Sequence, residues 1–138
     1  MPVALDLEAH SVEREVISVV DDDESIRESL PSLLEVLGFA ARPFASAEDF
    51  LASDVAADTR CLILDVSMPG MSGPQLQDEL SRRRLAVPII FITAQCDATL
   101  RATLLARGAV ECLLKPFSEK DLCSALDRAV GKPRAPAT

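Results

Sequence analysis

The sequence has few of the side chains that a zinc centre needs. Four cysteines and a single histidine, His10, occur among its 138 residues, and no two cysteines form a C-x-x-C pair. Structural zinc sites are built from closely spaced ligands of these types, so we expect none here. Cys61 and Cys112 fall within apolar stretches, where a reduced cysteine behaves as a small hydrophobic side chain.

Long apolar runs are also missing, and so is a basic N-terminus. No run approaches the roughly 18 apolar residues of a membrane-spanning helix. The first residues carry acids where a signal peptide carries bases. We therefore expect a cytoplasmic protein that makes no contact with a membrane.

Positive charge is in deficit, because 14 Lys and Arg residues stand against 22 Asp and Glu residues, for a net charge of −8. Nucleic acids and anionic membranes attract cationic surfaces, so this balance argues against both and leaves a metal or a charged protein partner. The length excludes a protein kinase and is typical of one domain. The densest acidic run, at 21–24, taken alone has an ordinary explanation as a solvated patch.

Five short apolar runs predict five β-strands. They are VISVV at 16–20, AARPF at 40–44, CLIL at 61–64, IIFI at 89–92 and VECLL at 110–114. Three of these runs are almost continuously apolar, which is typical of central strands buried on both faces. Pro43 in the second run lacks a backbone donor, which favours the edge of a sheet for that strand.

Helical patterns fill the intervals between these runs. The first spans 26–37 and ends at Gly38, and the later ones begin at Ser46, Ser72, Asp97 and Ser118. Ser72 and Gln75 have the spacing of a capping box, with a proline in the first turn. Pro31 falls inside the first pattern, where the lost backbone donor predicts a kink at a cost of roughly 3 kcal/mol.

Strand and helix thus alternate five times along the chain. Because crossovers between parallel strands are right-handed, this alternation predicts an α/β fold. We expect a doubly wound (βα)5, flavodoxin-like architecture, in which a five-stranded parallel sheet carries helices on both faces. Residues 15–130 would form the domain, with residues 1–14 and 131–138 as tails.

Polar side chains follow four of the five predicted strands. Asp21 and Asp22 follow the first, Asp65 the third, Thr93 the fourth and Lys115 the fifth. Ligands bind at the carboxyl ends of the strands in such a sheet, so we expect these side chains to converge. Three clustered carboxylates repel one another unless a cation neutralises them, and an all-oxygen ligand set favours Mg²⁺. An aspartate beside Mg²⁺ stays ionised and can attack phosphorus, with an ammonium and a hydroxyl stabilising the transferred group.

Each of these residues, taken alone, has an ordinary structural explanation. The run at 21–23 could be a solvated turn or a helix cap, and Asp65 could form an Asx-turn ahead of Pro69. Thr93 could simply end a strand, and Lys115 could belong to a turn. Their joint occurrence at the strand ends favours a phosphate acceptor over this combination of coincidences.

Four motifs resemble those of two-component response-regulator receiver domains. They are VVDDD at 19–23, DVSMPGMSG at 65–73, ITA at 92–94 and LKPF at 114–117. They occur in the family's order, and the likeness covers residues 15–130. The sequence is most similar to receivers that are usually fused to a helix-turn-helix output domain.

The resemblance implies a role for each residue at the strand ends. Asp65 would be the phosphoacceptor, and Mg²⁺ would bind Asp22 and Asp65 directly, the backbone carbonyl of Ser67, and Asp21 through water. Lys115 would contact the acyl phosphate, ahead of a cis peptide bond, and Thr93 would be the switch hydroxyl.

The resemblance also implies partners. The phosphoryl donor would be a sensor histidine kinase or a histidine phosphotransfer protein, docked largely against the first helix. The chain would act as a signalling switch rather than an enzyme, taking part only in its own phosphorylation and autodephosphorylation. Dimerisation on phosphorylation is common in the family. No motif in this chain reads DNA.

The sequence departs from the family pattern at several positions. Cys112 stands where the family usually carries the aromatic half of its switch, and Pro31 lies on the surface that a kinase would contact. Ser67 and Gln95 occupy the positions that tune the lifetime of the aspartyl phosphate. Only 21 residues follow Phe117, so the chain is either a stand-alone receiver or one cut at its linker.

Two other functions stay open at this point. One is a Mg²⁺-dependent phosphohydrolase with an aspartyl nucleophile, although such enzymes commonly carry an acid where this chain has Ser67. The other is a receiver-like interaction module that works without phosphorylation, which the substitution at Cys112 would suit.

Overall fold

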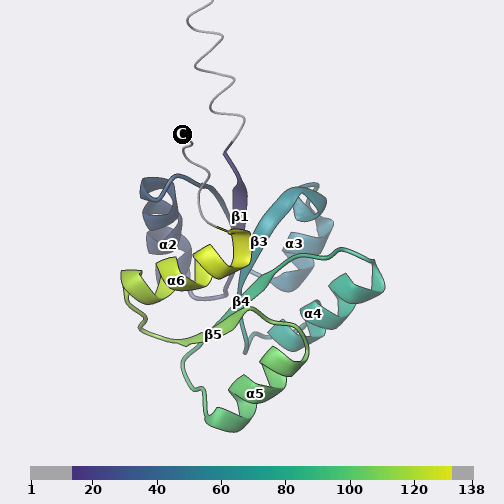
Figure 1. Cartoon of the computed structure of the whole chain (residues 1–138). Coiled ribbons are helices and arrows are strands. Elements are labelled where there is room, and N and C mark those ends of the chain that lie inside the picture. Colours follow the sequence, from purple (N-terminus) through teal and green to yellow (C-terminus); the bar gives the residue numbers. More distant parts are fainter. Residues whose placement is uncertain (1–13, 132–138) are drawn as a thin grey trace, which may run out of the picture.

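Five strands lie side by side in one parallel sheet (Figure 1). They are β1 (Val16–Val20), β2 (Ala40–Phe44), β3 (Thr59–Asp65), β4 (Ile89–Thr93) and β5 (Glu111–Leu114). Their order is β2-β1-β3-β4-β5, and every neighbouring pair is parallel. This computed structural model describes residues 14–131 and confirms the predicted flavodoxin-like α/β fold.

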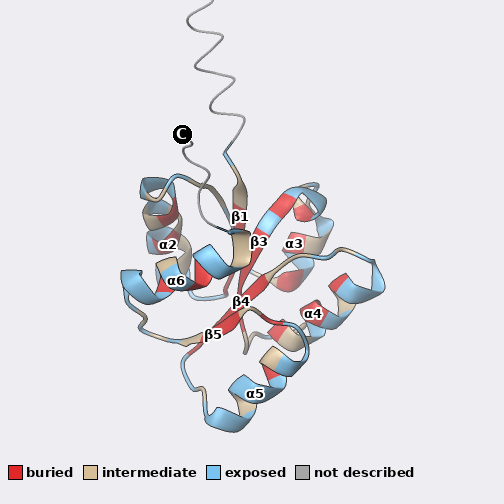
Figure 2. Ribbon diagram, in the orientation of Figure 1, coloured by how far each residue is buried: buried red, intermediate tan, exposed pale blue. Residues whose placement is uncertain are grey.

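Helices cover both faces of the sheet, as predicted (Figure 1). The helices are α2 (Glu24–Val36), α3 (Ala47–Ala52), α4 (Gly73–Arg82), α5 (Ala98–Ala106) and α6 (Glu119–Val130), with a short 3-10 turn at Ala56–Asp58. Leucines of α2 and α6 pack with one set of sheet side chains, whereas α3, α4 and α5 pack with the other set. Figure 2 shows the buried residues concentrated along the sheet and the inner helix faces.

The strands follow the apolar runs closely. Every residue of β4 is buried, and β3 is buried except at Arg60, which explains their continuously apolar sequences. β2 lies at the edge of the sheet, as Pro43 predicted. β3 begins at Thr59, two residues before the apolar run, because Thr59 pairs with Val16 of β1.

Each of the five α-helices begins at a side chain that accepts a hydrogen bond from the first turn. The capping residues are Asp23, Ser46, Ser72, Asp97 and Ser118. Ser72 and Gln75 form the complete capping box that their spacing predicts. These caps satisfy backbone donors that a helix leaves unpaired, and they fix where each helix starts beside the strand ends.

Pro31 does not interrupt the first helix. α2 continues through it, and the buried Leu30 and Leu34 lie on either side of the proline. Packing of these leucines against the sheet offsets the lost backbone hydrogen bond. The kink expected at Pro31 stays a prediction.

Some expectations fall on residues that the structure does not describe. His10 lies outside the described residues, and so do the two predicted tails except for Arg14 and Gly131. The domain limits of 15 and 130 stay predictions. Within residues 14–131, no helix has both the length and the apolar character needed to cross a membrane.

Candidate functional site

The order of the strands creates the site. The chain order reverses between β1 and β3, so the loops after these two strands leave toward opposite faces and open a crevice at the carboxyl edge. Asp21 directly follows β1, and Asp65 ends β3. The fold therefore places both carboxyl groups at the switch point of the sheet.

Asp21 is fully buried and firmly oriented. Its backbone N–H donates to the carbonyl of Phe44 over 3.1 Å, and its Oδ1 accepts a hydrogen bond of 2.9 Å from the N–H of Asp23. The guanidinium of Arg27 donates to the Asp21 carbonyl over 3.0 Å. The run at 21–24 thus has two parts, since Asp21 points into the molecule while Asp22 and Asp23 are exposed.

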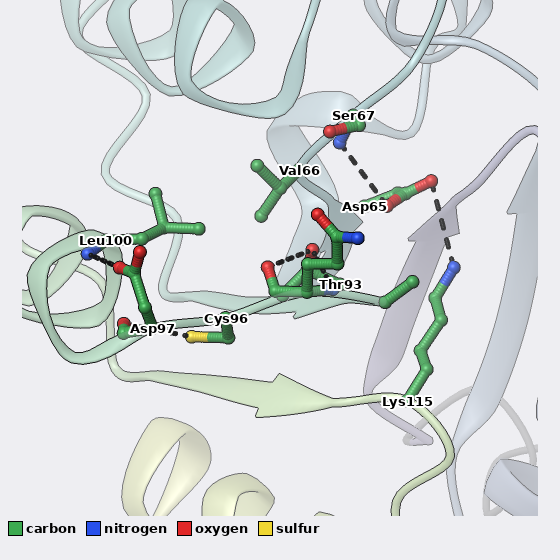
Figure 3. Close-up of a pocket in the computed structure, with 10 residues that line it drawn as sticks. Asp65, Val66, Ser67, Thr93, Cys96, Asp97, Leu100 and Lys115 are labelled. Atoms are coloured by element: carbon green, nitrogen blue, oxygen red, sulfur yellow. Dashed lines mark hydrogen bonds and ion pairs between the residues drawn. The ribbon is translucent and has the colours of Figure 1, made fainter.

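Asp65 is 6% exposed at the end of β3. Its Oδ1 accepts a long hydrogen bond of 3.4 Å from the N–H of Ser67, and its Oδ2 lies on the side of Lys115 (Figure 3). The pKa of Asp65 is raised to about 7, first because burial disfavours the charge and then because the Asp21 carboxylate repels it. An ionised Asp65 at neutral pH therefore benefits from further positive charge.

Lys115 supplies part of that charge. Its ammonium lies 2.7 Å from Asp21 Oδ2 and 3.8 Å from Asp65 Oδ2, and its backbone N–H donates to the Thr93 carbonyl over 2.8 Å. Burial lowers the pKa of Lys115, but the hydrogen bond to Asp21 and the surrounding carboxylates raise it above its ordinary value. The peptide bond from Lys115 to Pro116 is cis, as the resemblance implied.

Asp21, Asp22 and Asp65 form a set of oxygen ligands that suits a divalent cation. One carboxylate oxygen from each lies within 4.8 Å of the other two. One ammonium cannot neutralise three carboxylates, and Mg²⁺ prefers one or two carboxylates together with water and phosphate oxygens. Asp22 is exposed to solvent, which suits an ion that keeps water ligands. The raised pKa of Asp65 indicates that its carboxylate needs further positive charge, which a divalent cation supplies.

Thr93 ends β4 with its hydroxyl engaged in a local turn. Its Oγ1 donates to the carbonyl of Gln95 over 3.0 Å and accepts from the N–H of Gln95 over 3.2 Å (Figure 3). The side chain is 4% exposed, and it lines a hollow of about 650 Å³ together with Asp65, Ser67 and Lys115. The hollow has room for a phosphoryl group beside Asp65.

The structure brings together every site residue predicted from the sequence. Asp21, Asp22 and Asp65 cluster, and Lys115 contacts two of them. Ser67 and Thr93 line the same hollow as Asp65. The roles implied for them, including the carbonyl of Ser67 as a ligand, stay predictions.

Two supporting residues were missed from the sequence. A Cβ on Gly73 would lie 2.4 Å from the Asp65 carbonyl oxygen, so only glycine allows α4 to start against the end of β3. Glu48 of α3 accepts a hydrogen bond of 3.1 Å from the N–H of Met71 and thereby holds the loop after Asp65. Gly73 is the last residue of the motif at 65–73 and could have been identified from it. No residue near Glu48 in the sequence indicates its contact with Met71.

Comparisons with known proteins agree with this geometry. A family model described as the response regulator receiver domain matches residues 17–127. The transcriptional regulatory protein TdiR of Thauera aromatica is 42% identical over 114 residues, which are 83% of this chain and 50% of TdiR. The C4-dicarboxylate transport transcriptional regulatory protein DctR of Rhodobacter capsulatus is 44% identical over 108 residues, covering 77% of this chain and 55% of DctR.

Solved structures support the same relationship. The structure of FixJ-N is 36% identical to this chain and superposes with a TM-score of 0.75, covering 86% of this chain and 94% of FixJ-N. The chain spans about half the length of the curated relatives TdiR and DctR but nearly all of FixJ-N.

Proposed function

Because this chain belongs to the response regulator receiver domain family of two-component systems, we propose that it accepts a phosphoryl group on Asp65. The observation that carries the proposal is the convergence of three carboxylates and one ammonium at the carboxyl edge of the sheet. Its relatives are signalling regulators rather than classical enzymes, so we expect one phosphoryl group per chain and only slow autodephosphorylation.

The transfer is a displacement at phosphorus. A carboxylate oxygen of Asp65 attacks the phosphorus of a phosphohistidine, forming an O–P bond as the P–N bond breaks, and the imidazole leaves and takes a proton. Mg²⁺ held by Asp22, Asp65 and the carbonyl of Ser67, with Asp21 through water, would neutralise the charge on the carboxylates and phosphoryl oxygens. Lys115 already lies between two of these carboxylates, so a short movement would bring it to the phosphoryl group.

Thr93 supplies the conformational change in this proposal. Its hydroxyl now donates to Gln95, so a hydrogen bond to a phosphoryl oxygen would break the turn that holds residues 93–95. The loop into α5 would then rearrange, and α5 with β5 would present an altered surface. Cys112 would take part in this change where the family usually has an aromatic side chain.

The partners are inferred from the family. Receiver domains of response regulators interact with histidine kinases, and we propose that a kinase or histidine phosphotransfer protein docks against α2 beside Asp65. TdiR and DctR are transcriptional regulators about twice as long as the match, so, if this chain is part of a longer regulator, we propose that the remainder includes a DNA-binding output domain. Phosphorylation would favour a homodimer. The chain would bind its kinase in the cytoplasm.

Intact-mass measurement tests the proposed function. Protein incubated with Mg²⁺ and acetyl phosphate is expected to gain about 80 Da, the mass of one phosphoryl group. Asp65→Asn should gain nothing, whereas Asp54→Asn, which changes an exposed aspartate away from the site, should behave as wild type. Unmodified wild-type protein, or an equal gain in Asp65→Asn, would overturn the proposal. Release of many phosphates per chain from a phosphomonoester would favour the phosphohydrolase instead.

A further inference from the structure

Two cysteines that are distant in the sequence meet next to the site. The Sγ atoms of Cys96 and Cys112 lie 3.4 Å apart, although 16 residues separate them. All four cysteines of the chain carry free thiols, and Cys61 packs on the other face of the sheet. A disulfide bond is about 2.0 Å long, so the two sulfurs need approach by little more than 1 Å.

The two thiols differ in their access to solvent. Cys96 is half-buried in the loop between β4 and α5 and lines the hollow beside Asp65 and Thr93 (Figure 3). Cys112 is 6% exposed in β5, opposite Phe91 in the sheet register. An oxidant that enters the hollow therefore reaches Cys96 first, with Cys112 directly behind it.

We propose that Cys96 and Cys112 are a redox pair that hydrogen peroxide converts reversibly into a disulfide. The Cys96 thiol gives up its proton, the resulting thiolate attacks one peroxide oxygen, and the O–O bond breaks. The departing hydroxide takes up that proton, so the products are a sulfenic acid on Cys96 and water. The sulfur of Cys112 then attacks the sulfur of that sulfenic acid, the S–O bond breaks, and a second water leaves with the proton of Cys112. Two thiols have lost two hydrogen atoms and one peroxide has become two waters. A dithiol reductant reverses the reaction by exchange.

The surroundings of Cys112 agree with this order of events. Burial raises the pKa of Cys112 to about 12, helped by its hydrogen bond to Cys96 and by the negative charge that Cys96 can carry. A thiol that stays protonated reacts poorly with peroxide, so Cys112 is not the first target. Conversion of Cys96 to an uncharged sulfenic acid removes the repulsion that opposes a thiolate on Cys112.

The bond would connect two segments that flank the proposed switch. Cys96 directly follows Gln95, whose backbone holds the Thr93 hydroxyl, and Cys112 lies three residues before Lys115. A disulfide would tie the loop between β4 and α5 to β5 and hold Thr93 in its present turn. Oxidation is therefore expected to slow the phosphorylation of Asp65, because the Thr93 hydroxyl would be held away from the incoming phosphoryl group. This consequence rests on the proposed function, while the disulfide itself does not.

Peptide mapping of the peroxide-treated chain tests the disulfide. Cleavage after Lys and Arg, except before proline, places the four cysteines in separate peptides, at 61–82, 85–101, 108–120 and 121–128. The expected product is peptide 85–101 linked to 108–120, lighter by two hydrogen atoms and separated again by dithiothreitol. The link should persist in the Cys61→Ala/Cys123→Ser chain and vanish in Cys96→Ser and in Cys112→Ala. Peptides that stay unlinked, a link to 121–128, or Cys96 oxidised to sulfinic acid while Cys112 stays free would overturn the proposal.

Phosphorylation of the two redox forms tests the consequence. With Mg²⁺ and acetyl phosphate, the linked chain is expected to gain phosphoryl mass about fivefold more slowly than the reduced chain. A factor of about five is at the low end of the coupling found between two sites in a protein. Cys96→Ser should be phosphorylated at the same rate with and without peroxide treatment. Equal rates for linked and reduced wild type would refute the coupling. No gain in the reduced chain would refute the phosphoacceptor function and leave the peptide map to decide the disulfide.

Discussion

The ammonium of Lys115 lies 2.7 Å from Asp21 Oδ2, closer than the 3.8 Å that separates it from Asp65 Oδ2. Asp21 is fully buried, so this ion pair is shielded from solvent and holds the lysine beside the proposed metal ligands. The 3.8 Å to Asp65 leaves the proposed phosphoacceptor only partly neutralised. Burial and then repulsion by the Asp21 carboxylate raise the pKa of Asp65, and Lys115 offsets this only in part. Burial lowers the pKa of Lys115, but its hydrogen bond to Asp21 and the nearby carboxylates raise it above the ordinary value.

Replacing Asp65 with asparagine is expected to stabilise the metal-free protein at pH 8. The pKa of Asp65 is about 7 in the folded chain, above the ordinary value of about 3.9 in the unfolded chain. The folded state thus binds more protons between these values, and its stability falls as pH rises through them. Asp65→Asn removes that loss, so it should raise the free energy of unfolding at pH 8 by on the order of 1 kcal/mol or more.

Urea denaturation with a chelator, at pH 4 and pH 8, measures this effect. Asp65→Asn and wild type should be nearly equal at pH 4 and differ at pH 8. Asp54→Asn serves as the control and should follow wild type at both pH values. A difference between Asp65→Asn and wild type that is the same at pH 4 and pH 8 would contradict the raised pKa.

Mg²⁺ is expected to stabilise the folded chain through the three aspartates. A ligand that binds only the folded state adds about 1.4 kcal/mol at ten times its dissociation constant. Asp22 is exposed, so Asp22→Asn should unfold like wild type without metal but lose most of the Mg²⁺ effect. Thermal unfolding across a Mg²⁺ titration measures this. An undiminished shift in Asp22→Asn would exclude that carboxylate as a ligand.

The geometry of the strand ends was largely predictable from the sequence. β1 and β2 begin and end at the predicted residues. β1 is a buried apolar run bounded by polar residues, and β2 is the partly exposed edge strand that Pro43 indicated. The convergence of Asp21, Asp65 and Lys115 followed from the parallel topology. The 2.7 Å pair between Lys115 and Asp21 was not predictable, since it depends on side-chain directions at the sheet edge.

Side-chain contacts between neighbouring helices, strands and loops were the hardest features to predict from the sequence. The proximity of Cys96 and Cys112 depends on the register that places Cys112 opposite Phe91 and on the path of the loop after Thr93. Glu111 lies in a predicted apolar run, yet it is a buried carboxylate held by Arg101 and Arg128 from two different helices. Neither spacing nor periodicity identifies such partners.

Gly73→Ala is expected to destabilise the fold and disturb the site together. The added Cβ would lie 2.4 Å from the Asp65 carbonyl oxygen and 3.0 Å from Phe91 Cε1, so β3 and α4 must separate. Overpacking of this kind typically costs about 1–3 kcal/mol. Gly108→Ala is the comparison, because it adds a Cβ in open space and costs only backbone strain. Urea denaturation should show a lower stability for Gly73→Ala, and intact mass should show less phosphorylation. Unimpaired phosphorylation of Gly73→Ala would argue against a role for Gly73 in supporting the site.

Glu111→Gln is expected to lower stability at neutral pH by about 1–2 kcal/mol, because two half-exposed arginines lose a charged partner. Burial raises the pKa of Glu111, but hydrogen bonds from Arg128, the Cys112 N–H and Arg101 outweigh it and lower that pKa. The resulting stability is present above the unfolded pKa and is lost as pH falls through the folded pKa. Denaturation midpoints of the variant should therefore converge with wild type in acid. A gap that stays constant into acid would contradict this account.

The position of the phosphoryl group decides whether Asp65 is the phosphoacceptor. Borohydride reduces an aspartyl phosphate to homoserine, and cleavage after Lys and Arg separates the candidates into peptides 1–14 with His10, 15–27 with Asp21 and Asp22, and 61–82 with Asp65. After reaction with Mg²⁺ and acetyl phosphate, we expect homoserine at position 65 and at no other aspartate. A reduced residue in peptide 15–27, or none in peptide 61–82 of a phosphorylated chain, would contradict it.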